Sequence, residues 1–329
     1  MLPFVGHTKP VRCAAFAPDG RTLVSGGDDG RLLVWDRLSA GVRHAIPIGF
    51  APVRAVACHP DGDRVAAGWR YPALSVHGAG SRDRIRFWHL ATGKVAVDVD
   101  PGGSRYWERV AGADPQEIDI SDSAGLARLA FDPAGTRLFA VEAGPVTNFI
   151  LNENQPWVRQ YHLGPPREPV TTGWLDRRRS VRAFALSADG RTAAVASDKY
   201  VRVGRLDAPA VPPGYAAGGD VHSLALTADG DLLAGCWADR VTVWATAGGP
   251  VREFAGHTAA VEAVAAHPAE SVVASAGRDG VVMLWEPATG AVRARYDWHL
   301  GPVHALAFAP DGLTLAVAGD DGLVCVDLE

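Results

Sequence analysis

Two distant stretches of the chain contain histidine, serine, aspartate and tryptophan in the same order. The first set is His7, Ser25, Asp29 and Trp35, and the second set is His257, Ser275, Asp279 and Trp285. In serine hydrolases, a histidine and an aspartate activate a serine as the nucleophile. An enzyme needs one such triad, however, so a set that recurs within one chain favours a structural role.

A second group of polar residues recurs at one position of short apolar segments, just after the first apolar residue, as Arg12 follows Val11. The residues at this position are Arg12, Arg54, Ala127, Arg182, His222, Glu262 and His304. With neutral histidines the group has three positive side chains and one negative. It could therefore hold a carboxylate or a phosphate, with arginine as a bidentate donor. The alternative is a water-filled opening in which these charges pair with neighbours.

Three members of this group could instead bind a metal ion. Two histidines and a carboxylate are ligands that suit a divalent transition metal. His222, Glu262 and His304 come from successive segments, but no short ligand spacing of the kind seen in zinc sites supports this reading. We therefore expect no metal and no other cofactor.

All of these residues belong to short strands that repeat along the chain. Pro18-Asp19-Gly20 and six variants of this turn each separate two apolar strands, as the first turn separates 11–16 from 22–25. The turns lie at residues 18, 60, 133, 188, 228, 268 and 310, in steps of 42, 73, 55, 40, 40 and 42. A period near 40 residues made of short strands predicts an all-β propeller with one blade for each repeat.

The repeats resemble the WD40, or G-protein β-type, family. The resemblance rests on the Gly6-His7 start and the Trp35-Asp36 end of the first repeat, and on their counterparts Gly256-His257 and Trp285-Glu286. It implies a seven-bladed β-propeller of four-stranded antiparallel blades. It also implies that each Trp, Ser, His and Asp set forms a buried network, and that the recurrent polar position lines the top mouth of a central channel.

We expect one domain over residues 1–329, with blades at about 6–48, 49–99, 121–176, 178–217, 218–255, 256–297 and 298–329. The last repeat lacks an outer strand, so residues 2–5 are expected to pair there and close the ring. Some blades depart from the repeat pattern. Blade 2 lacks the initial histidine, and blade 7 has Val317 and Asp327 where serine and tryptophan are expected.

The two long steps indicate extra residues in blades 2 and 3. We expect insertions 69–82 and 143–155 between the second and third strands of these blades, and insertion 100–120 between the blades, all on the top face. Loops tolerate drift and can pack on themselves, but tryptophan, tyrosine and arginine dominate binding hot spots. The candidate partner-binding residues are Trp69, Arg70, Tyr71, His77, Arg82, Tyr106, Trp107, Arg109, Phe149, Asn152 and Asn154.

The composition limits the possible functions. The net charge of −5 opposes a general attraction to nucleic acid or to an anionic membrane, and we expect Arg177–Arg179 to form a solvated loop. No apolar run is long enough to span a membrane, and no secretory signal is visible. The four cysteines lack disulfide or metal spacing, which favours a cytoplasmic location.

These observations together favour a non-catalytic scaffold that binds a protein or peptide on its top face. The binding surface is expected to combine the insertions of blades 2 and 3 with the polar channel mouth, and the chain is expected to be a monomer on its own. An acidic or carboxylate group on the partner would suit the arginines of the mouth. The alternative is an enzyme, or a small-ligand or metal-binding propeller, that acts at the channel mouth.

Overall fold

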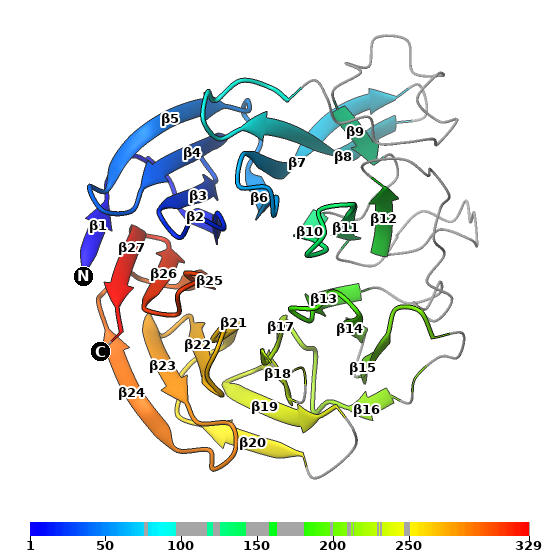
Figure 1. Cartoon of the computed structure of the whole chain (residues 1–329), viewed down its shortest axis with the longest axis vertical. Coiled ribbons are helices and arrows are strands. Elements are labelled where there is room, and N and C mark those ends of the chain that lie inside the picture. Colours follow the sequence, from blue (N-terminus) through cyan, green and yellow to red (C-terminus); the bar gives the residue numbers. More distant parts are fainter. Residues whose placement is uncertain are drawn as a thin grey trace.

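The computed structural model describes residues 1–75, 78–96, 117–120, 126–142, 158–162, 181–197, 200–208, 212, 214–228, 230, 232–246 and 251–328. These residues form β-strands and no helix. Their strands make six four-stranded sheets and one three-stranded sheet. Figure 1 shows the sheets arranged like blades around a central axis, which is the predicted all-β propeller architecture.

The first three blades follow the chain in order from the inner strand outward. Blade 1 contains β2 (Val11–Phe16), β3 (Thr22–Gly27), β4 (Arg31–Asp36) and β5 (Gly41–Pro47). Blade 2 contains β6 (Val53–Cys58), β7 (Arg64–Ser75), β8 (Gly78–His89) and β9 (Glu117–Ile120). The described strands of blade 3 are β10 (Leu126–Phe131), β11 (Arg137–Glu142) and β12 (Val158–His162).

The remaining blades repeat the same antiparallel order. Blade 4 contains β13 (Val181–Leu186), β14 (Thr192–Ser197), β15 (Tyr200–Arg205) and β16 (Gly214–Ala216). Blade 5 contains β17 (Ser223–Leu226), β18 (Leu232–Trp237), β19 (Arg240–Ala245) and β20 (Arg252–Ala255). Blade 6 contains β21 (Val261–Ala266), β22 (Val273–Gly277), β23 (Val281–Trp285) and β24 (Val292–Asp297). Blade 7 contains β25 (Val303–Phe308), β26 (Thr314–Gly319), β27 (Gly322–Asp327) and β1 (Leu2–Phe4).

The Asp-Gly turns explain why the strands reverse at regular intervals. In the first turn the Asp19 carboxylate accepts hydrogen bonds from the backbone N–H groups of Arg21 and Thr22, at 2.9 and 2.8 Å. Gly20 adopts a φ of 63°, which lies in the left-handed region that glycine enters without steric cost. Aspartate and glycine therefore supply the local chemistry of a tight turn between two apolar strands.

The hydrophobic core lies between neighbouring blades. The inner strands contact one another in the circular order β2, β6, β10, β13, β17, β21 and β25, and β25 in turn contacts β2. One core cluster joins blades 1 and 2 and includes Val34, Val53 and Trp88. Because a neighbouring blade covers each face of a sheet, every residue of β3 is buried.

The N-terminal strand forms the outer strand of the blade that contains the C-terminal strands. β1 pairs with β27, with Leu2 opposite Cys325 and Phe4 opposite Leu323. Phe4 is 4% exposed, and its ring meets Trp35 of blade 1 edge-on at 5.3 Å between centroids. The predicted pairing of the N-terminal segment with the last blade is therefore confirmed, and Figure 1 shows the two termini close together.

Two of the predicted insertions need correction. Residues 69–75 and 78–82 belong to strands rather than to a loop, because β7 and β8 pair from Arg64↔His89 to Ser75↔Gly78. Residues 100–120 were expected between blades 2 and 3, but Val95 and then β9 both pair with β8. This insertion therefore interrupts the outer strand of blade 2, which ends at Ile120 rather than near residue 99. The third predicted insertion, 143–155, lies outside the described residues, between β11 and β12.

Candidate functional site

Five of the six recurrent polar residues lie at β-bulges near the start of the inner strands. The strand register shifts between Val11 and Cys13, so Arg12 is the extra residue of the bulge. The same shift occurs at Arg54, Arg182, Glu262 and His304. A bulge turns one side chain away from the regular alternation of the strand, which leaves room for a polar side chain at this position. With His222, these residues line one central cavity of about 680 Å³.

The charged residues of the mouth pair with neighbouring side chains. We call the end of the ring where the inner strands begin the top face, and the opening of the cavity there the mouth. Within single blades, Arg12 lies 2.5 Å from Asp28, Glu262 lies 2.6 Å from Arg278, and His304 lies 2.7 Å from Asp320. Between blades, Arg182 lies 3.2 Å from Asp220, and Arg54 lies 3.9 Å from Asp28.

This pairing changes the prediction of a net positive mouth. Among the described residues, the mouth has four positive and four negative side chains. The arginines are Arg12, Arg54, Arg182 and Arg278, and the carboxylates are Asp28, Asp220, Glu262 and Asp320. The alternative of internally paired charges therefore describes the mouth better than an open anion ring. The sequence could have predicted this pairing, because the two residues of each within-blade pair are 16 positions apart. Such a partner comes from the turn between the second and third strands of the same blade.

The same contacts weigh against the metal-binding alternative. Among the residues that the structure describes, no group of three or more His, Cys, Asp and Glu side chains could hold a metal ion. His222, Glu262 and His304 do line the same cavity. The Glu262 carboxylate, however, accepts a hydrogen bond from Arg278, and His304 lies against Asp320.

The structure describes only part of the candidate partner-binding set. Trp69 is 4% exposed and packs against Trp88 in the core between blades 1 and 2, so its side chain offers no surface to a partner. Arg70, Tyr71 and Arg82 lie in the β7–β8 hairpin, with Tyr71 opposite Arg82. His77, Tyr106, Trp107, Arg109, Phe149, Asn152 and Asn154 lie outside the described residues.

Phe50 is an exposed aromatic residue that the sequence reasoning did not select. It is 108% exposed and lies between β5 and β6, on the top face. Blade 2 has this phenylalanine where the first and sixth repeats have His7 and His257. The sequence pattern indicates only that blade 2 lacks the initial histidine. An aromatic residue in a loop at this position is also a signal of a contact residue, and it could have been used as one.

The two histidine sets form nearly identical hydrogen-bond networks. The Trp35 indole N–H donates to Ser25 Oγ at 2.8 Å, and His7 Nε2 lies 2.8 Å from the same oxygen. His7 Nδ1 lies 2.9 Å from Asp29 Oδ2. In blade 6 the three corresponding distances are 2.7, 2.8 and 2.9 Å, between Trp285, Ser275, His257 and Asp279.

These networks contain the residues of a catalytic triad, but a substrate cannot reach either serine. Ser25 and Ser275 are both 0% exposed, and a tryptophan already donates a hydrogen bond to each hydroxyl. Burial is the main influence on His7 and lowers its pKa, although Asp29 opposes this effect. A buried and fully paired polar network fixes the geometry of a blade and gives a substrate no route to the serine.

The comparisons with known proteins agree with this geometry. The family model described as "WD domain, G-beta repeat" matches residues 2–36, 248–286 and 290–326, which include both networks. These three regions of the chain are WD repeats. The histidine networks of blades 1 and 6 lie in the first two of these regions. In the last WD repeat, which has Val317 and Asp327 at the serine and tryptophan positions, His299 is exposed and lies 3.0 Å from Asp297.

Curated relatives of these WD repeats come from several kinds of protein. The human ribosome biogenesis protein BOP1 is 28% identical over 299 residues, which cover 86% of this chain and 38% of the relative. The small ribosomal subunit protein RACK1y of Oryza sativa subsp. japonica is 33% identical over 99 residues, which cover 30% of this chain and 29% of the relative. Human transducin beta-like protein 3 is 31% identical over 98 residues, 12% of its length. The chain thus matches well under half of each of these relatives. Among the described residues, no helix is long and apolar enough to cross a membrane.

Proposed function

We propose that this WD-repeat chain is a non-catalytic scaffold that binds a partner protein on the top face of blades 1 and 2. Two features form the proposed partner surface: the exposed Phe50 and the projecting β7–β8 hairpin. The paired charges of the channel mouth border this surface. The chain needs no cofactor for this role, and we propose that it acts in the cytoplasm as a monomer that joins larger assemblies.

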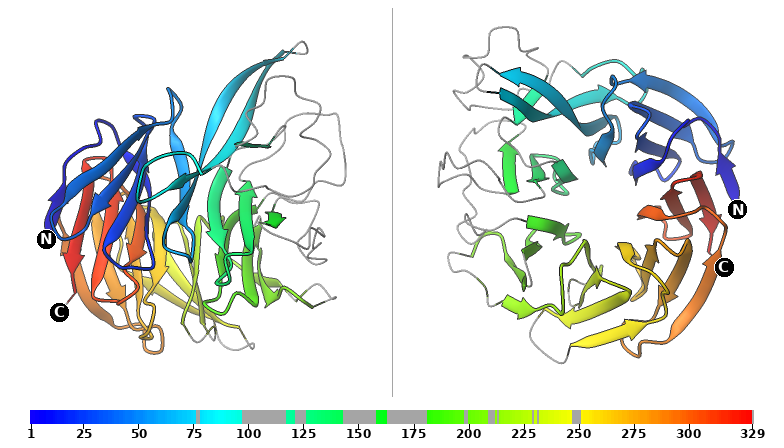
Figure 2. Two further views of the ribbon diagram at one scale, coloured as in Figure 1. Left: turned by 45° about the horizontal axis from the view of Figure 1, so that its top comes forward. Right: turned by 180° about the vertical axis from the view of Figure 1, so that it is seen from behind.

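The height of the hairpin is the observation that carries this proposal. Val53, at the start of the inner strand β6, is the register partner of Trp69. β7 continues for six residues beyond Trp69, to Ser75, and therefore extends about 20 Å above the level of the mouth. Figure 2 shows this cyan hairpin projecting beyond the neighbouring blades. A hairpin of this length adds an accessible surface beside the ring without any change to the blade core.

The chemistry of Phe50 supports the same surface. A fully exposed phenylalanine leaves its whole ring in water, and its burial against a partner would contribute about 1.5–3 kcal/mol. Arg54 follows four residues later, and 47% of its side chain is exposed. An aromatic anchor with a neighbouring arginine has the composition of an interface hot spot. The partner is expected to offer an apolar pocket for Phe50 and an acidic group near Arg54.

Affinity capture with matched surface variants tests this proposal. The wild-type chain and the variants Phe50→Ser and Leu313→Ser would be used to capture partners from the source organism, followed by mass spectrometry. Leu313 is 63% exposed and lies in the turn between β25 and β26, on the face opposite the mouth. A third variant would shorten the hairpin by joining residues 69 and 84 through a two-residue turn.

We expect the Leu313→Ser variant to capture the partner as the wild type does. The Phe50→Ser variant and the variant with the shortened hairpin should not capture it. Phe50→Ser and Leu313→Ser should keep the circular dichroism spectrum of the wild type, because neither removes a buried side chain. Equal capture by the wild type and Phe50→Ser would contradict the proposed surface. Since two relatives are named as ribosomal or ribosome biogenesis proteins, ribosomal proteins are the first class to look for among the captured proteins.

A further inference from the structure

Arg128 of blade 3 departs from the pattern of the inner strands. The position directly after the recurrent polar position holds small residues in the six other blades: Cys13, Ala55, Ala183, Ser223, Ala263 and Ala305. In blade 3 the register shift lies between Leu126 and Arg128, so the arginine occupies this position. A long cationic side chain therefore enters the channel wall where the other blades have almost none.

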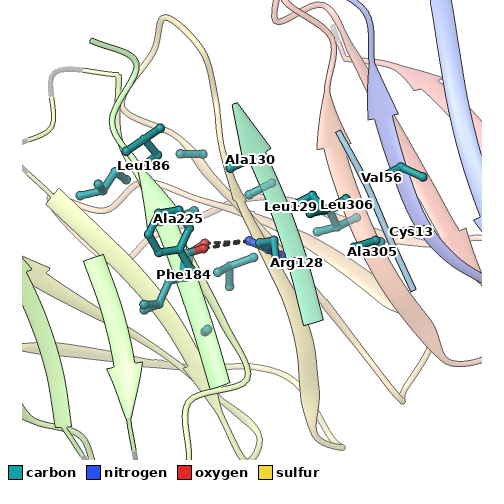
Figure 3. A pocket seen from close by; sticks show the side chains of 18 of the residues that line it. Cys13, Val56, Arg128, Leu129, Ala130, Phe184, Leu186, Ala225, Ala305 and Leu306 are labelled. Carbon is teal, nitrogen blue, oxygen red and sulfur yellow. Dashed lines mark hydrogen bonds between the residues drawn. The ribbon is translucent and has the colours of Figure 1, made fainter. Parts of the chain in front are cut away.

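The Arg128 side chain crosses blade 4 and reaches blade 5. Its Nη1 donates to the carbonyl oxygens of Phe184, at 3.4 Å, and Leu224, at 3.3 Å. Its Nη2 donates to Ser223 Oγ at 3.3 Å. Figure 3 shows the side chain leaving β10 toward Phe184 along the wall of the cavity. All three acceptors are uncharged, and all three bonds are longer than the usual 2.9–3.0 Å.

Arg128 thus differs from the arginines of the mouth. Arg12, Arg182 and Arg278 each lie within hydrogen-bond reach of a carboxylate, whereas Arg128 has no carboxylate partner among the described residues. Burial lowers its pKa below the ordinary value for arginine. A partly buried cation without a counter-charge is costly, and arginine stays protonated in proteins. An anion in the channel would relieve this cost.

The cavity has room and donors for such an anion. Its volume is about 680 Å³, and Leu129, Leu186 and Leu306 are among the residues that line it. Three of the five N–H groups of Arg128 are engaged in the bonds described above. The Nε–H group and one Nη2–H group have no partner among the described residues. A carboxylate can accept two such hydrogen bonds at once.

We propose that the central channel binds a small organic carboxylate, with its oxygens accepting hydrogen bonds from Arg128 and its apolar part contacting the leucines and alanines of the wall. The site lies inside the ring, and it does not depend on the partner surface of Phe50 and the hairpin. The competing explanation gives Arg128 a purely structural role, in which its bonds to blades 4 and 5 hold three neighbouring blades together.

Calorimetric titration of the full chain with hexanoate separates these explanations. The neutral analogue 1-hexanol has the same chain length and serves as the matched ligand. The proposal predicts saturable binding of hexanoate, at least about tenfold tighter than that of hexanol, because a charge-assisted bidentate bond contributes about 1.5–3 kcal/mol. Arg128→Gln should weaken hexanoate binding by a similar factor. Arg278→Gln, a control at the mouth, should leave it within about twofold.

Three results would overturn the proposal: no saturable binding of hexanoate, equal binding of hexanoate and hexanol, or unchanged binding by Arg128→Gln. If Arg128→Gln does not fold, the comparison of hexanoate with hexanol on the wild-type chain still decides the question. None of these results would test the proposed partner surface at Phe50, because the titrations contain no partner protein.

Discussion

Phe4 provides the sharpest test of how the two ends of the chain are joined. Its side chain is 4% exposed and packs with Trp35 and Leu33 of blade 1 and with Leu323 of blade 7. Replacement of a buried phenylalanine by alanine costs about 3–5 kcal/mol, which includes the cavity that remains. For a chain of this size, 1 kcal/mol shifts the melting temperature by about 2 °C, so Phe4→Ala should melt about 6–10 °C below the wild type.

Differential scanning calorimetry of the purified chain would measure this shift. Val5→Ala is the matched control, because Val5 is 86% exposed and follows the paired strand. A substitution at such a surface position changes the free energy of unfolding by about 0.5 kcal/mol or less. Equal melting temperatures for Phe4→Ala and Val5→Ala would refute the packing of β1 between the first and last blades.

Three further predictions follow from the hydrogen-bond networks and the buried thiols. Ser275→Ala leaves the Trp285 N–H and a nitrogen of His257 without a partner, so the free energy of unfolding should fall by about 1–3 kcal/mol. Urea titrations would measure this change, with the exposed Ser271→Ala as a control that should have little effect. Burial lowers the pKa of His7, so the unfolded state binds more protons below about pH 6.5, and stability should fall as the pH is lowered through this range, with a flatter profile for His7→Gln. Burial raises the pKa of all four cysteine thiols to about 12, so a colorimetric thiol reagent should label them only slowly until the chain is unfolded.

The periodic features of the fold could be predicted because they depend on local chemistry. An Asp-Gly turn such as Asp19-Gly20 needs no information from distant parts of the chain. The missing outer strand of the last repeat could be predicted because the repeat has a fixed number of strands. The bulge position of Arg12 could also be found, since neighbouring repeats align residue by residue around it.

The corrections concern contacts between segments that the period does not relate. β9 is only four residues long and is separated from the rest of its strand by an insertion, so no repeat pattern indicates that it pairs with β8. Tryptophan is common both in binding hot spots and in hydrophobic cores. Only the packing of Trp69 against Trp88 shows that it is a core residue. Arg128 lies one residue beyond the aligned polar position, where sequence alone gives no reason to expect a side chain in the channel.

The proposed partner surface is tested most directly by site-specific photo-crosslinking. A photoreactive phenylalanine analogue would be placed at position 50 in one chain and at position 313 in another, since both positions are exposed but lie on opposite faces. The account predicts that irradiation in cells joins the chain to a specific protein from position 50 and not from position 313. The same crosslinked protein from position 313, with none from position 50, would contradict it.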